Sequence, residues 1–297
     1  MLKIFFDTDI GGDSDDAGAL SLLCNLSRAK QAEIVGAAST TTRRGAADCI
    51  RAIAEHYKVR FPVGELKGEP FLGDEDGNIY AGYFDRQGGE KTEDSVRVFR
   101  RAVSGTQGKI RLVAVGPLKN VALYLKSKGD DLSDMDGISL FREKVEALYI
   151  MGGCFADSYY AGNLVDVEYN IVQDIPSAQY VTEHCPCPVY FSPFELGNRV
   201  FTGKNVLKEE GHPAGECYRR FNLRWNASGE RQSWDPITAY FAATDGGGLL
   251  TFGKAGKVTI LPDGKSVFRE EEKGRHFIIL PKVSFESISE ELNRWIV

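Results

Sequence analysis

The 297-residue chain has no excess of positive charge and no apolar run that approaches the length of a bilayer span. Its 42 acidic residues outnumber its 36 lysines and arginines, and the two signs are interspersed, which gives a net charge of −6. We therefore expect neither nucleic acid nor a membrane as a partner. The start also lacks the basic and apolar regions of a secretory signal, since Asp7 and Asp9 interrupt it, so we expect a cytoplasmic protein.

Cysteine and histidine are scarce, with six and four copies respectively. The run His184-Cys185-Pro186-Cys187 has the residue types of a soft-metal site, but no second Cys/His pair with zinc spacing accompanies it. We interpret this run as a helix end that leads into a strand. Cys24 and Cys49 lie in apolar, helix-like stretches, which is typical of small buried side chains, and we expect reduced thiols.

Strand-like and helix-like patterns alternate through the first two thirds of the chain, which predicts βαβ units and a mostly parallel sheet with helices on both faces. The expected strands are Leu2–Phe6, Glu33–Ser39, Arg60–Val63, Ile110–Val115, Val145–Met151 and Pro188–Phe191. The expected helices are Asp16–Arg28, Ala46–Tyr57, Thr92–Val103, Leu118–Lys126 and Pro176–His184. The stretch Gly64–Gly89 is too long for an ordinary connection, and loops of that length are usually functional.

The last part of the chain has a different pattern. A turn signal at Pro262-Asp263-Gly264 lies between two β-type runs and predicts an antiparallel ribbon, and Ser284–Ile296 has the pattern of a terminal helix. The β-type runs are Lys257–Leu261, Ser266–Glu270 and His276–Leu280. No linker, internal repeat or low-complexity segment divides the sequence, so we expect one domain over residues 1–297.

Five aspartates stand within ten residues directly after the first expected strand, in the run Asp7-Thr8-Asp9-Ile10-Gly11-Gly12-Asp13-Ser14-Asp15-Asp16. Carboxylates this close repel one another, so a fold that keeps them must neutralise them. A hard divalent cation bound through oxygen ligands would do so. The end of a buried strand is also where open α/β sheets bind their ligands. The motif therefore predicts a metal-dependent active site.

Two simpler interpretations of this acidic run fit less well. A solvated loop that caps the next helix accounts for Asp15 or Asp16, but not for five aspartates. An EF-hand loop counted from Asp7 needs an oxygen donor at Gly11 and a glutamate at Gly18, and the chain has neither.

Further motifs follow expected strands or precede expected helices. They are Gly116-Pro117-Leu118-Lys119-Asn120, Gly152-Gly153, Gly162-Asn163, Glu168-Tyr169-Asn170 and Trp234-Asp235-Pro236. Each has an ordinary explanation alone: Asp235, for example, is a suitable helix N-cap with Pro236 at the first helical position. Together with the acidic run, however, the motifs have the order and approximate spacing of the inosine–uridine-preferring nucleoside hydrolases. The chain resembles that family from residue 5 to about residue 245.

The resemblance implies a Rossmann-like open α/β fold, one bound Ca²⁺, and hydrolysis of the N-glycosidic bond of ribonucleosides or related ribosides to ribose and free base. It also implies a homodimer or homotetramer. The chemistry is physically coherent, because carboxylates stabilise the oxocarbenium-like state of glycosidic cleavage. Calcium's roomy coordination shell holds sugar hydroxyls and a water together.

The resemblance also implies roles for individual residues. The metal ligands are Asp9, Asp16, Asp235 and the backbone carbonyl of Lys119, and Asp9 also takes the proton of the attacking water. Asp15 accepts the ribose 2′-hydroxyl, while Asn163, Glu168 and Asn170 hold the ribose hydroxyls. Asp7 supports the loop from behind. Gly12, Asp13 and Ser14 make the acidic loop longer than the familiar family pattern, which leaves open how Asp13 and Asp15 share the sugar contact.

Trp234 is the main departure from the family pattern. It stands where well-studied members have a histidine that protonates a leaving purine, and none of the four histidines falls in a matched motif. Trp234 is a candidate for stacking on a base or aglycone, but an indole is no acid near neutral pH. Leaving-group activation then requires Tyr159, Tyr160 or Glu195, or a leaving group that departs unassisted.

Two other function classes remain open from the sequence. Haloacid-dehalogenase-type phosphatases also begin with an apolar strand that ends in Asp-x-Asp and use Mg²⁺, but they need Thr or Val at Gly11 and have no further aspartate cluster. A non-catalytic, Ca²⁺-dependent riboside-binding protein would keep the metal loop and lose turnover. Phosphate release, or tight riboside binding without hydrolysis, would identify these alternatives.

Overall fold

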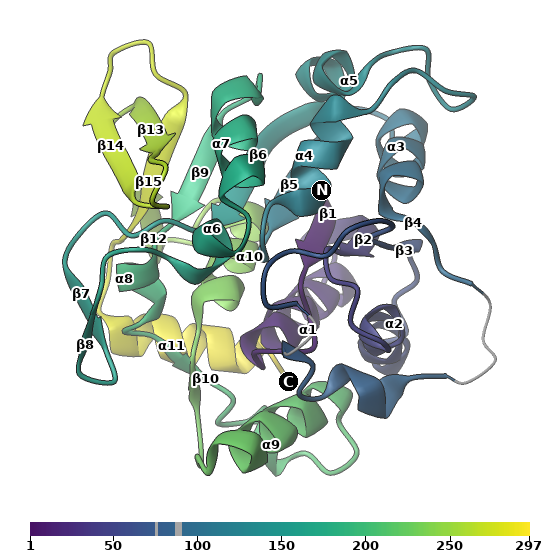
Figure 1. The fold of residues 1–297 in the computed structure, drawn as a ribbon. Coiled ribbons are helices and arrows are strands. Elements are labelled where there is room, and N and C mark those ends of the chain that lie inside the picture. Colours follow the sequence, from purple (N-terminus) through teal and green to yellow (C-terminus); the bar gives the residue numbers. More distant parts are fainter. Residues whose placement is uncertain (75–76, 87–90) are drawn as a thin grey trace.

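The computed structural model describes residues 1–74, 77–86 and 91–297, and its central element is an 11-stranded sheet (Figure 1). The strand order is β14-β13-β15-β9-β6-β5-β1-β2-β3-β4, with β12 paired to β15. All pairs from β15 to β4 along this order are parallel, whereas β12, β13 and β14 pair antiparallel. The strands are β1 (Leu2–Thr8), β2 (Ala32–Ser39), β3 (Val63–Glu65), β4 (Glu93–Asp94), β5 (Ile110–Ala114), β6 (Val145–Met151), β9 (Val189–Ser192), β12 (Leu250–Phe252), β13 (Gly256–Ile260), β14 (Ser266–Glu270) and β15 (His276–Pro281).

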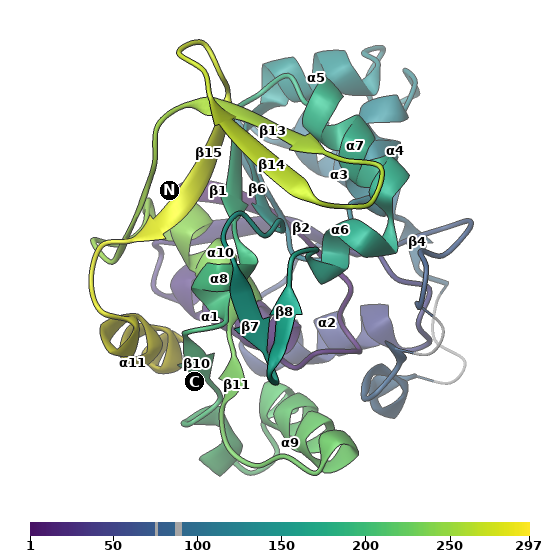
Figure 2. The same cartoon turned by 60° about the vertical axis from the view of Figure 1, so that its left-hand side comes forward.

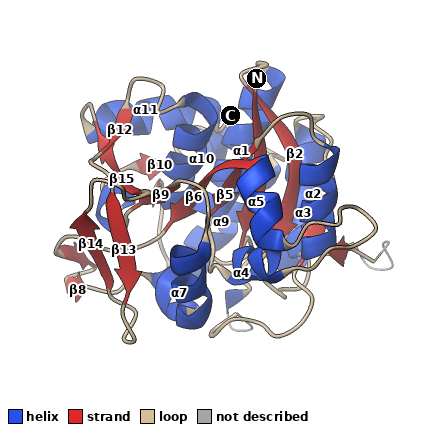
Figure 3. Cartoon of the chain, turned by 90° about the horizontal axis from the view of Figure 1, so that it is seen from above, coloured by secondary structure: helices blue, strands red, loops and turns tan. Residues whose placement is uncertain are grey.

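Helices cover both faces of the sheet, and each face has its own hydrophobic core (Figure 3). One core contains residues of α1 (Asp15–Arg28), α2 (Ala46–His56), α9 (Pro213–Trp225), α10 (Trp234–Thr244) and α11 (Phe285–Trp295). The other contains residues of α3 (Ser95–Gly105), α4 (Lys119–Lys126), α5 (Gly137–Lys144) and α7 (Ile175–His184). Strand β1 shows why: Ile4 and Phe6 belong to the first core and Phe5 to the second, because successive side chains of a strand point to opposite faces.

Two short ribbons lie outside the main sheet. One is the hairpin of β7 (Ser158–Tyr160) and β8 (Asn163–Val165), whose turn residues Ala161 and Gly162 have positive φ angles of 49° and 83°. The other pairs β10 (Phe201–Thr202) with β11 (Arg231–Gln232). Figure 2 shows the hairpin extending toward α9 and β11. Three further short helices are α6 (Tyr169–Gln173), α8 (Phe194–Gly197) and the 3₁₀ helix η3 (Val206–Lys208).

The predicted α/β class, with a mostly parallel sheet between two helical layers, is confirmed. Two predicted elements begin three residues later than expected. The strand expected at Arg60–Val63 begins only at Val63, because Pro62 has no N–H for a ladder and instead accepts a hydrogen bond from the Ala37 amide through its carbonyl. The helix expected from Thr92 begins at Ser95, because the Asp94 side chain caps it through the Val96 amide.

The long segment Gly64–Gly89 contains the 3₁₀ helix η2 (Ala81–Phe84), while residues 75–76 and 87–89 of it lie outside the described residues. The predicted C-terminal ribbon is present as β13 and β14, and the terminal helix is present as α11. The third predicted strand, β15, pairs in parallel with β9 and so joins this ribbon to the main sheet. Within the described residues, no helix combines the length and the apolar character that a membrane crossing needs.

Candidate active site

The candidate site lies at the edge of the sheet where the parallel strands end. Asp9 follows β1, Gly116 follows β5 and Gly152 follows β6, so the predicted motifs meet at one edge. The approach is close: a Cβ added to Gly116 would lie 2.6 Å from Oδ1 of Asp9. Glycine at 116 is therefore needed for the chain after β5 to pass beside the Asp9 carboxylate.

Four buried aspartates form an acidic cluster at this edge: Asp9, Asp15, Asp16 and Asp235. Asp15 and Asp16 open α1, and Asp235 lies in the first turn of α10, which packs against α1. Carboxylate oxygens of Asp15, Asp16 and Asp235 all lie within 4.8 Å of one another. The structure thus brings together residues that are 219 and 220 positions apart in the sequence.

Two carboxylates of the cluster, those of Asp15 and Asp16, are oriented by their neighbours. Oδ2 of Asp15 accepts hydrogen bonds from the backbone amides of Trp234 at 3.0 Å and Asp235 at 3.2 Å. The Thr8 hydroxyl donates to Oδ1 of Asp16. The site is therefore rigid, because α1, α10 and the end of β1 hold it from three sides.

The ionised carboxylates of the cluster carry more negative charge than the neighbouring cations balance. Burial raises the pKa values of Asp9, Asp15, Asp16 and Asp235 above the ordinary aspartate range, and repulsion from neighbouring carboxylates, that of Asp13 among them, raises them further. The ion pairs at this edge include those of Arg43 with Asp9 and of Arg231 with Asp13, and among the described residues no ion pair reaches Asp15, Asp16 or Asp235. An all-oxygen, acid-rich donor set with no matching cation fits a hard divalent ion.

Asp7 lies one layer behind the cluster and holds the strand end. Its Oδ2 accepts hydrogen bonds from Nδ2 of Asn120 at 2.9 Å and from the Tyr124 hydroxyl at 2.6 Å. Burial raises the pKa of Asp7 to about 7 despite these bonds. The contacts tie β1 to α4, and they agree with a supporting role for Asp7.

No sequence pattern indicates Arg43, which is buried beside Asp9. Its Nη1 donates to the Asp9 carbonyl oxygen and lies 3.4 Å from Oδ2 of Asp9, while its Nε lies 3.4 Å from Oδ1 of Asp74. The Asp74 carboxylate in turn accepts from the Thr42 amide at 2.7 Å. Gly77 leaves space for the guanidinium, since a Cβ there would lie 2.2 Å from Nη2. These pairings join distant loops, so local sequence patterns carry no signal for them.

Of the residues expected to hold the ribose, Glu168 and Asn170 are buried. Glu168 is buried and caps α6, with its two oxygens accepting from the amides of Asn170 at 2.8 Å and Ile171 at 3.2 Å. Nδ2 of Asn170 donates to the carbonyl oxygen of Val115 at 3.0 Å, which ties α6 to the end of β5. Burial raises the pKa of Glu168 to about 7. Both residues lie at the site edge.

Asn163 and Lys119 are less closely tied to the cluster. Asn163 is exposed on β8, and its side chain donates to the carbonyl of Ala161 at 3.4 Å. The structure therefore does not bring Asn163 into the acidic cluster. Lys119 is the first residue of α4, directly after Gly116–Leu118, and its Nζ lies 3.6 Å from Oδ2 of Asp174. This placement turns its side chain to another acid and leaves its backbone near the edge.

Trp234 is packed inside an aromatic group. Its ring is 5.4 Å from that of Phe194 in a stacked arrangement, and its Nε1 donates to the Phe194 carbonyl at 2.9 Å. The Tyr160 ring approaches it edge-on at 6.2 Å, and the Arg231 guanidinium lies 4.9 Å from its centroid. Trp234 is only 7% exposed, so these neighbours fix its ring.

Arg231 connects this aromatic group to the acidic loop. Its Nε donates to Oδ1 of Asp13 at 2.9 Å, and its Nη2 also pairs with that carboxylate. Its Nη1 donates to the Tyr160 hydroxyl at 2.8 Å. Asp13 is thus held by Arg231, whereas Asp15 belongs to the acidic cluster. The structure gives the two aspartates different environments.

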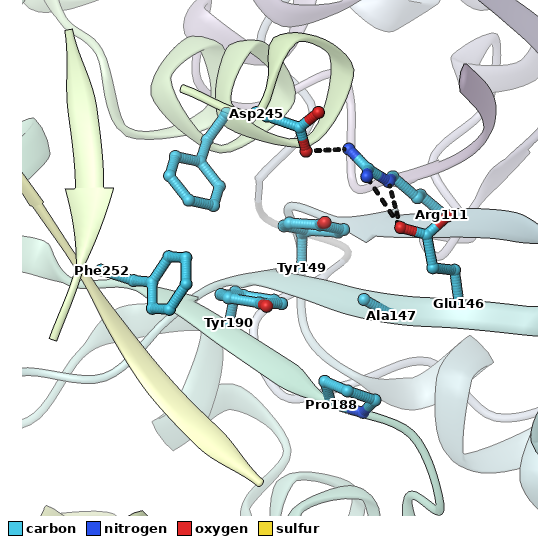
Figure 4. Close-up of a pocket in the computed structure, with 9 residues that line it drawn as sticks. Arg111, Glu146, Ala147, Tyr149, Pro188, Tyr190, Asp245 and Phe252 are labelled. Atoms are coloured by element: carbon cyan, nitrogen blue, oxygen red, sulfur yellow. Dashed lines mark hydrogen bonds and ion pairs between the residues drawn. The ribbon is translucent and has the colours of Figure 1, made fainter. Parts of the chain in front are cut away.

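A separate hollow of about 200 Å³ lies at the opposite edge of the sheet, near the starts of β5, β6 and β9 (Figure 4). Its charged residue Arg111 bonds to Glu146 at 2.7 Å and to Asp245 at 2.8 Å. The aromatic rings of Tyr149 and Tyr190 stack beside it at 5.0 Å. Because its charges are mutually paired and no residue of the acidic cluster lines it, this hollow is not the candidate active site.

Known proteins share this fold. A structure of an inosine-uridine preferring nucleoside hydrolase from Bacillus anthracis is 20% identical, with a TM-score of 0.73 over 100% of this chain and 99% of that chain. An inosine-guanosine nucleoside hydrolase is 17% identical, with a TM-score of 0.74 over 100% of this chain and 99% of that one.

A curated relative from Oryza sativa subsp. japonica, named "Probable uridine nucleosidase 2", is 29% identical over 224 residues, 69% of this chain. The match spans 60% of the rice protein's length. The profile of the family described as inosine-uridine preferring nucleoside hydrolase matches residues 4–281. The chain therefore belongs to the inosine-uridine preferring nucleoside hydrolase family.

Proposed function

We propose that this protein is a Ca²⁺-dependent N-ribosyl hydrolase, which cleaves the N-glycosidic bond of ribonucleosides or related ribosides to ribose and free base. The observation that carries the proposal is the buried acidic cluster of Asp9, Asp15, Asp16 and Asp235 at the strand ends. Its family membership and the name of its rice relative agree with this reaction. The family assignment leaves no support for the phosphatase alternative.

The metal would be held by Asp9, Asp16, Asp235 and the backbone carbonyl of Lys119. Their oxygens suit Ca²⁺, which takes six to eight oxygen ligands in a flexible shell. The raised pKa values of the three carboxyls indicate charge that a cation would neutralise. When bound, such an ion orients sugar hydroxyls and a water, and lowers the pKa of that water.

The chain's own residues then perform the remaining steps. Asp9 accepts the proton of the attacking water as a general base. Asp15 has Oδ2 committed to the amides of Trp234 and Asp235, so its other oxygen is the one that would accept the ribose 2′-hydroxyl. The buried carboxylates stabilise positive charge as it develops on the sugar ring, because they lie in a low-dielectric environment.

Glu168 and Asn170 would position the far side of the ribose. Both are buried, and their hydrogen bonds to Gly153, Val115 and Met151 fix them against the ends of β5 and β6. Asn163 is exposed on β8 and is not part of this buried set. A rigid set of sugar contacts lowers the entropic cost of reaching the transition state.

A reducing-sugar assay tests the proposed function. The panel contains purine, pyrimidine and nicotinamide ribosides, with and without Ca²⁺, and Asp9→Ala is the matched inactive control. Ribose release that needs Ca²⁺ and disappears in Asp9→Ala supports the proposal. Ca²⁺-dependent riboside binding without any release would instead support a non-catalytic binding protein.

The family resemblance also suggests a homodimer or homotetramer that acts on a small riboside. Light scattering after size-exclusion chromatography tests the assembly. A monomer at all concentrations would contradict it without affecting the proposed reaction.

A further inference from the structure

Hydrolysis of a nucleoside needs a group that helps the base to leave, and this requirement rests on the proposed function. The four histidines are engaged elsewhere. The rings of His56 and His212 lie 4.2 Å apart next to Tyr57, His184 stacks on Tyr180, and Nδ1 of His276 accepts from the Val258 amide. A different proton donor must therefore serve the leaving group.

Tyr160 lies close to the residues that we propose bind the ribose. Its ring packs edge-on against Trp234, whose own backbone amide binds the carboxylate of Asp15. One residue, Trp234, therefore lies between the Tyr160 side chain and the Asp15 carboxylate that we assign to the ribose. It reaches this position because the β7–β8 hairpin extends toward β11 (Figure 2).

The hydrogen bond from Arg231 prepares the Tyr160 hydroxyl as a donor. Nη1 of Arg231 donates to the phenolic oxygen at 2.8 Å, which uses an oxygen lone pair and leaves the phenolic proton available. The guanidinium is largely buried and is held from its other side by Asp13, so its direction is fixed. A cation beside the oxygen also stabilises a phenolate if the proton leaves.

The other candidate donors are placed less favourably. Tyr159 is 65% exposed, and its backbone carbonyl accepts a hydrogen bond from Nδ2 of Asn198. Both oxygens of Glu195 face the Phe155 amide, at 3.2 and 3.4 Å. Tyr160 alone among the three contacts both Trp234 and the arginine that binds the acidic loop.

We propose that the Tyr160 hydroxyl donates its proton to the leaving base, and that Arg231, anchored by Asp13, is the positioning residue for this donor. The C1′–N bond breaks and its electron pair passes to the base. The phenolic proton moves to the base, which leaves neutral, while the attacking water gives its proton to Asp9. Solvent then returns a proton to the phenolate and removes the one from Asp9.

A comparison of two substrates tests this role. Uridine needs help with its leaving group, whereas 4-nitrophenyl riboside releases a phenolate that departs without protonation. Tyr160→Phe keeps the ring and its packing but removes the hydroxyl. We expect kcat for uridine to fall by about 10²- to 10⁴-fold. We expect kcat for the nitrophenyl riboside to change by less than about threefold, because the ribose half of the site is unaltered.

Further variants separate the proposal from a structural effect. Arg231→Gln should show the same selective loss, smaller in size, with little change in KM for the nitrophenyl substrate. Tyr180→Phe, on α7 beside His184, is a matched control that should retain both activities. Equal losses on both substrates in Tyr160→Phe, or a selective loss in Tyr159→Phe or Glu195→Gln instead, would overturn the proposal.

The wild-type protein distinguishes failure of this inference from failure of the proposed function. A wild type that hydrolyses neither substrate overturns both. A wild type that hydrolyses both substrates, with Tyr160→Phe unchanged on uridine, overturns only the role of Tyr160. Turnover of the nitrophenyl riboside alone does the same, because no leaving-group donor then operates.

Discussion

The two edges of the main sheet both combine an arginine with carboxylates, yet they handle the charge in opposite ways. At the strand starts, Arg111 bonds to Glu146 and Asp245, whose side chains are 46% and 70% exposed, so water shares the stabilisation. At the strand ends, Arg43 lies between the buried carboxylates of Asp9 and Asp74. The exposed ion pairs of Arg111 need no ligand, whereas the buried carboxylates at the strand ends carry charge that a bound cation would balance.

This difference explains which end of the fold carries chemistry. Buried carboxylates with raised pKa values are costly to the folded chain, and folds keep them where they serve binding or catalysis. The hollow beside Arg111 is lined by aromatic rings and paired charges, and it has no such cost. Space alone is therefore a poorer guide to the site in this molecule than unbalanced buried charge.

The largest expected effect comes from removing Arg43 at the strand ends, with removal of Arg111 at the strand starts as the comparison. Arg43→Met leaves the buried carboxylates of Asp9 and Asp74 without a cation, and we expect a loss of about 3 to 5 kcal/mol in the free energy of unfolding. Arg111→Met leaves two hydrated carboxylates and one unpaired carbonyl, at Ala242, and should cost about 1 to 1.5 kcal/mol. Urea unfolding of both variants checks this, and equal losses would break the comparison.

The sequence predicts the acidic edge well and its arginines not at all. The aspartate run is local, and the match of Asp235 to a motif was enough to place it, although α10 lies far from α1 in the chain. Arg43 pairs with Asp74, and Arg231 with Asp13, through loops that meet only in the folded protein. Such contacts have no periodicity or spacing, so sequence patterns do not indicate them.

The same limit applies to the fold. The alternation of strands and helices predicts the parallel sheet, because burial on both faces gives continuous apolar runs. No sequence pattern indicated the β7–β8 hairpin or helix α9, which contact Arg231 through Tyr160 and Phe221. The hairpin strands have only three residues each, which is too short for a clear period.

Asp235→Asn should separate stability from activity at the acidic edge. Removing one carboxylate of the proposed metal site should lower kcat/KM by about 10²- to 10³-fold. At neutral pH the ion-free variant should nevertheless be more stable than the ion-free wild type, because repulsion with Asp15 and Asp16 is relieved. Ribose-release kinetics and thermal melts in chelator measure the two effects.

Asp245→Asn is the control at the opposite edge. It removes one exposed partner of Arg111 and should leave both quantities close to those of the wild type. A loss of activity without any gain in stability in Asp235→Asn would mean that its carboxyl is already neutral in the ion-free protein.

Removing the metal should have a smaller effect with a defined pH dependence. Burial raises the pKa of Asp7 and of Glu168 to about 7, so each binds its proton more tightly in the folded chain. The stabilisation that Asp7 and Glu168 give the folded chain by binding a proton is complete below about pH 4. It is lost as the pH rises toward 7. Ca²⁺ at 100 times its Kd should raise Tm at pH 7.5 by about 5 °C.

The Ca²⁺-induced rise in Tm should shrink at pH 5, because protons then compete for the clustered carboxyls. His212 and His276, with pKa values lowered to about 4 by burial, titrate in the opposite sense. Comparing Tm with and without Ca²⁺ at each pH cancels their contribution. A rise of the same size at pH 5 and pH 7.5 would place the ion away from these aspartates.

The smallest effect is expected from Glu146→Gln, which tests whether the strand-start edge is as inert as its geometry indicates. Arg111 keeps its bonds to Asp245 and to the carbonyl of Ala242, and the glutamine can still accept a hydrogen bond. Since Glu146 is half exposed, the ion pair should contribute less than about 1 kcal/mol to the free energy of unfolding. Ribose release should not change, because Glu146 is linked to the acidic cluster indirectly, through β6 and through Arg111 bound to the far end of α10. A large loss of activity in Glu146→Gln would show that the two edges are coupled through the sheet, and the contrast between them would then no longer locate the site.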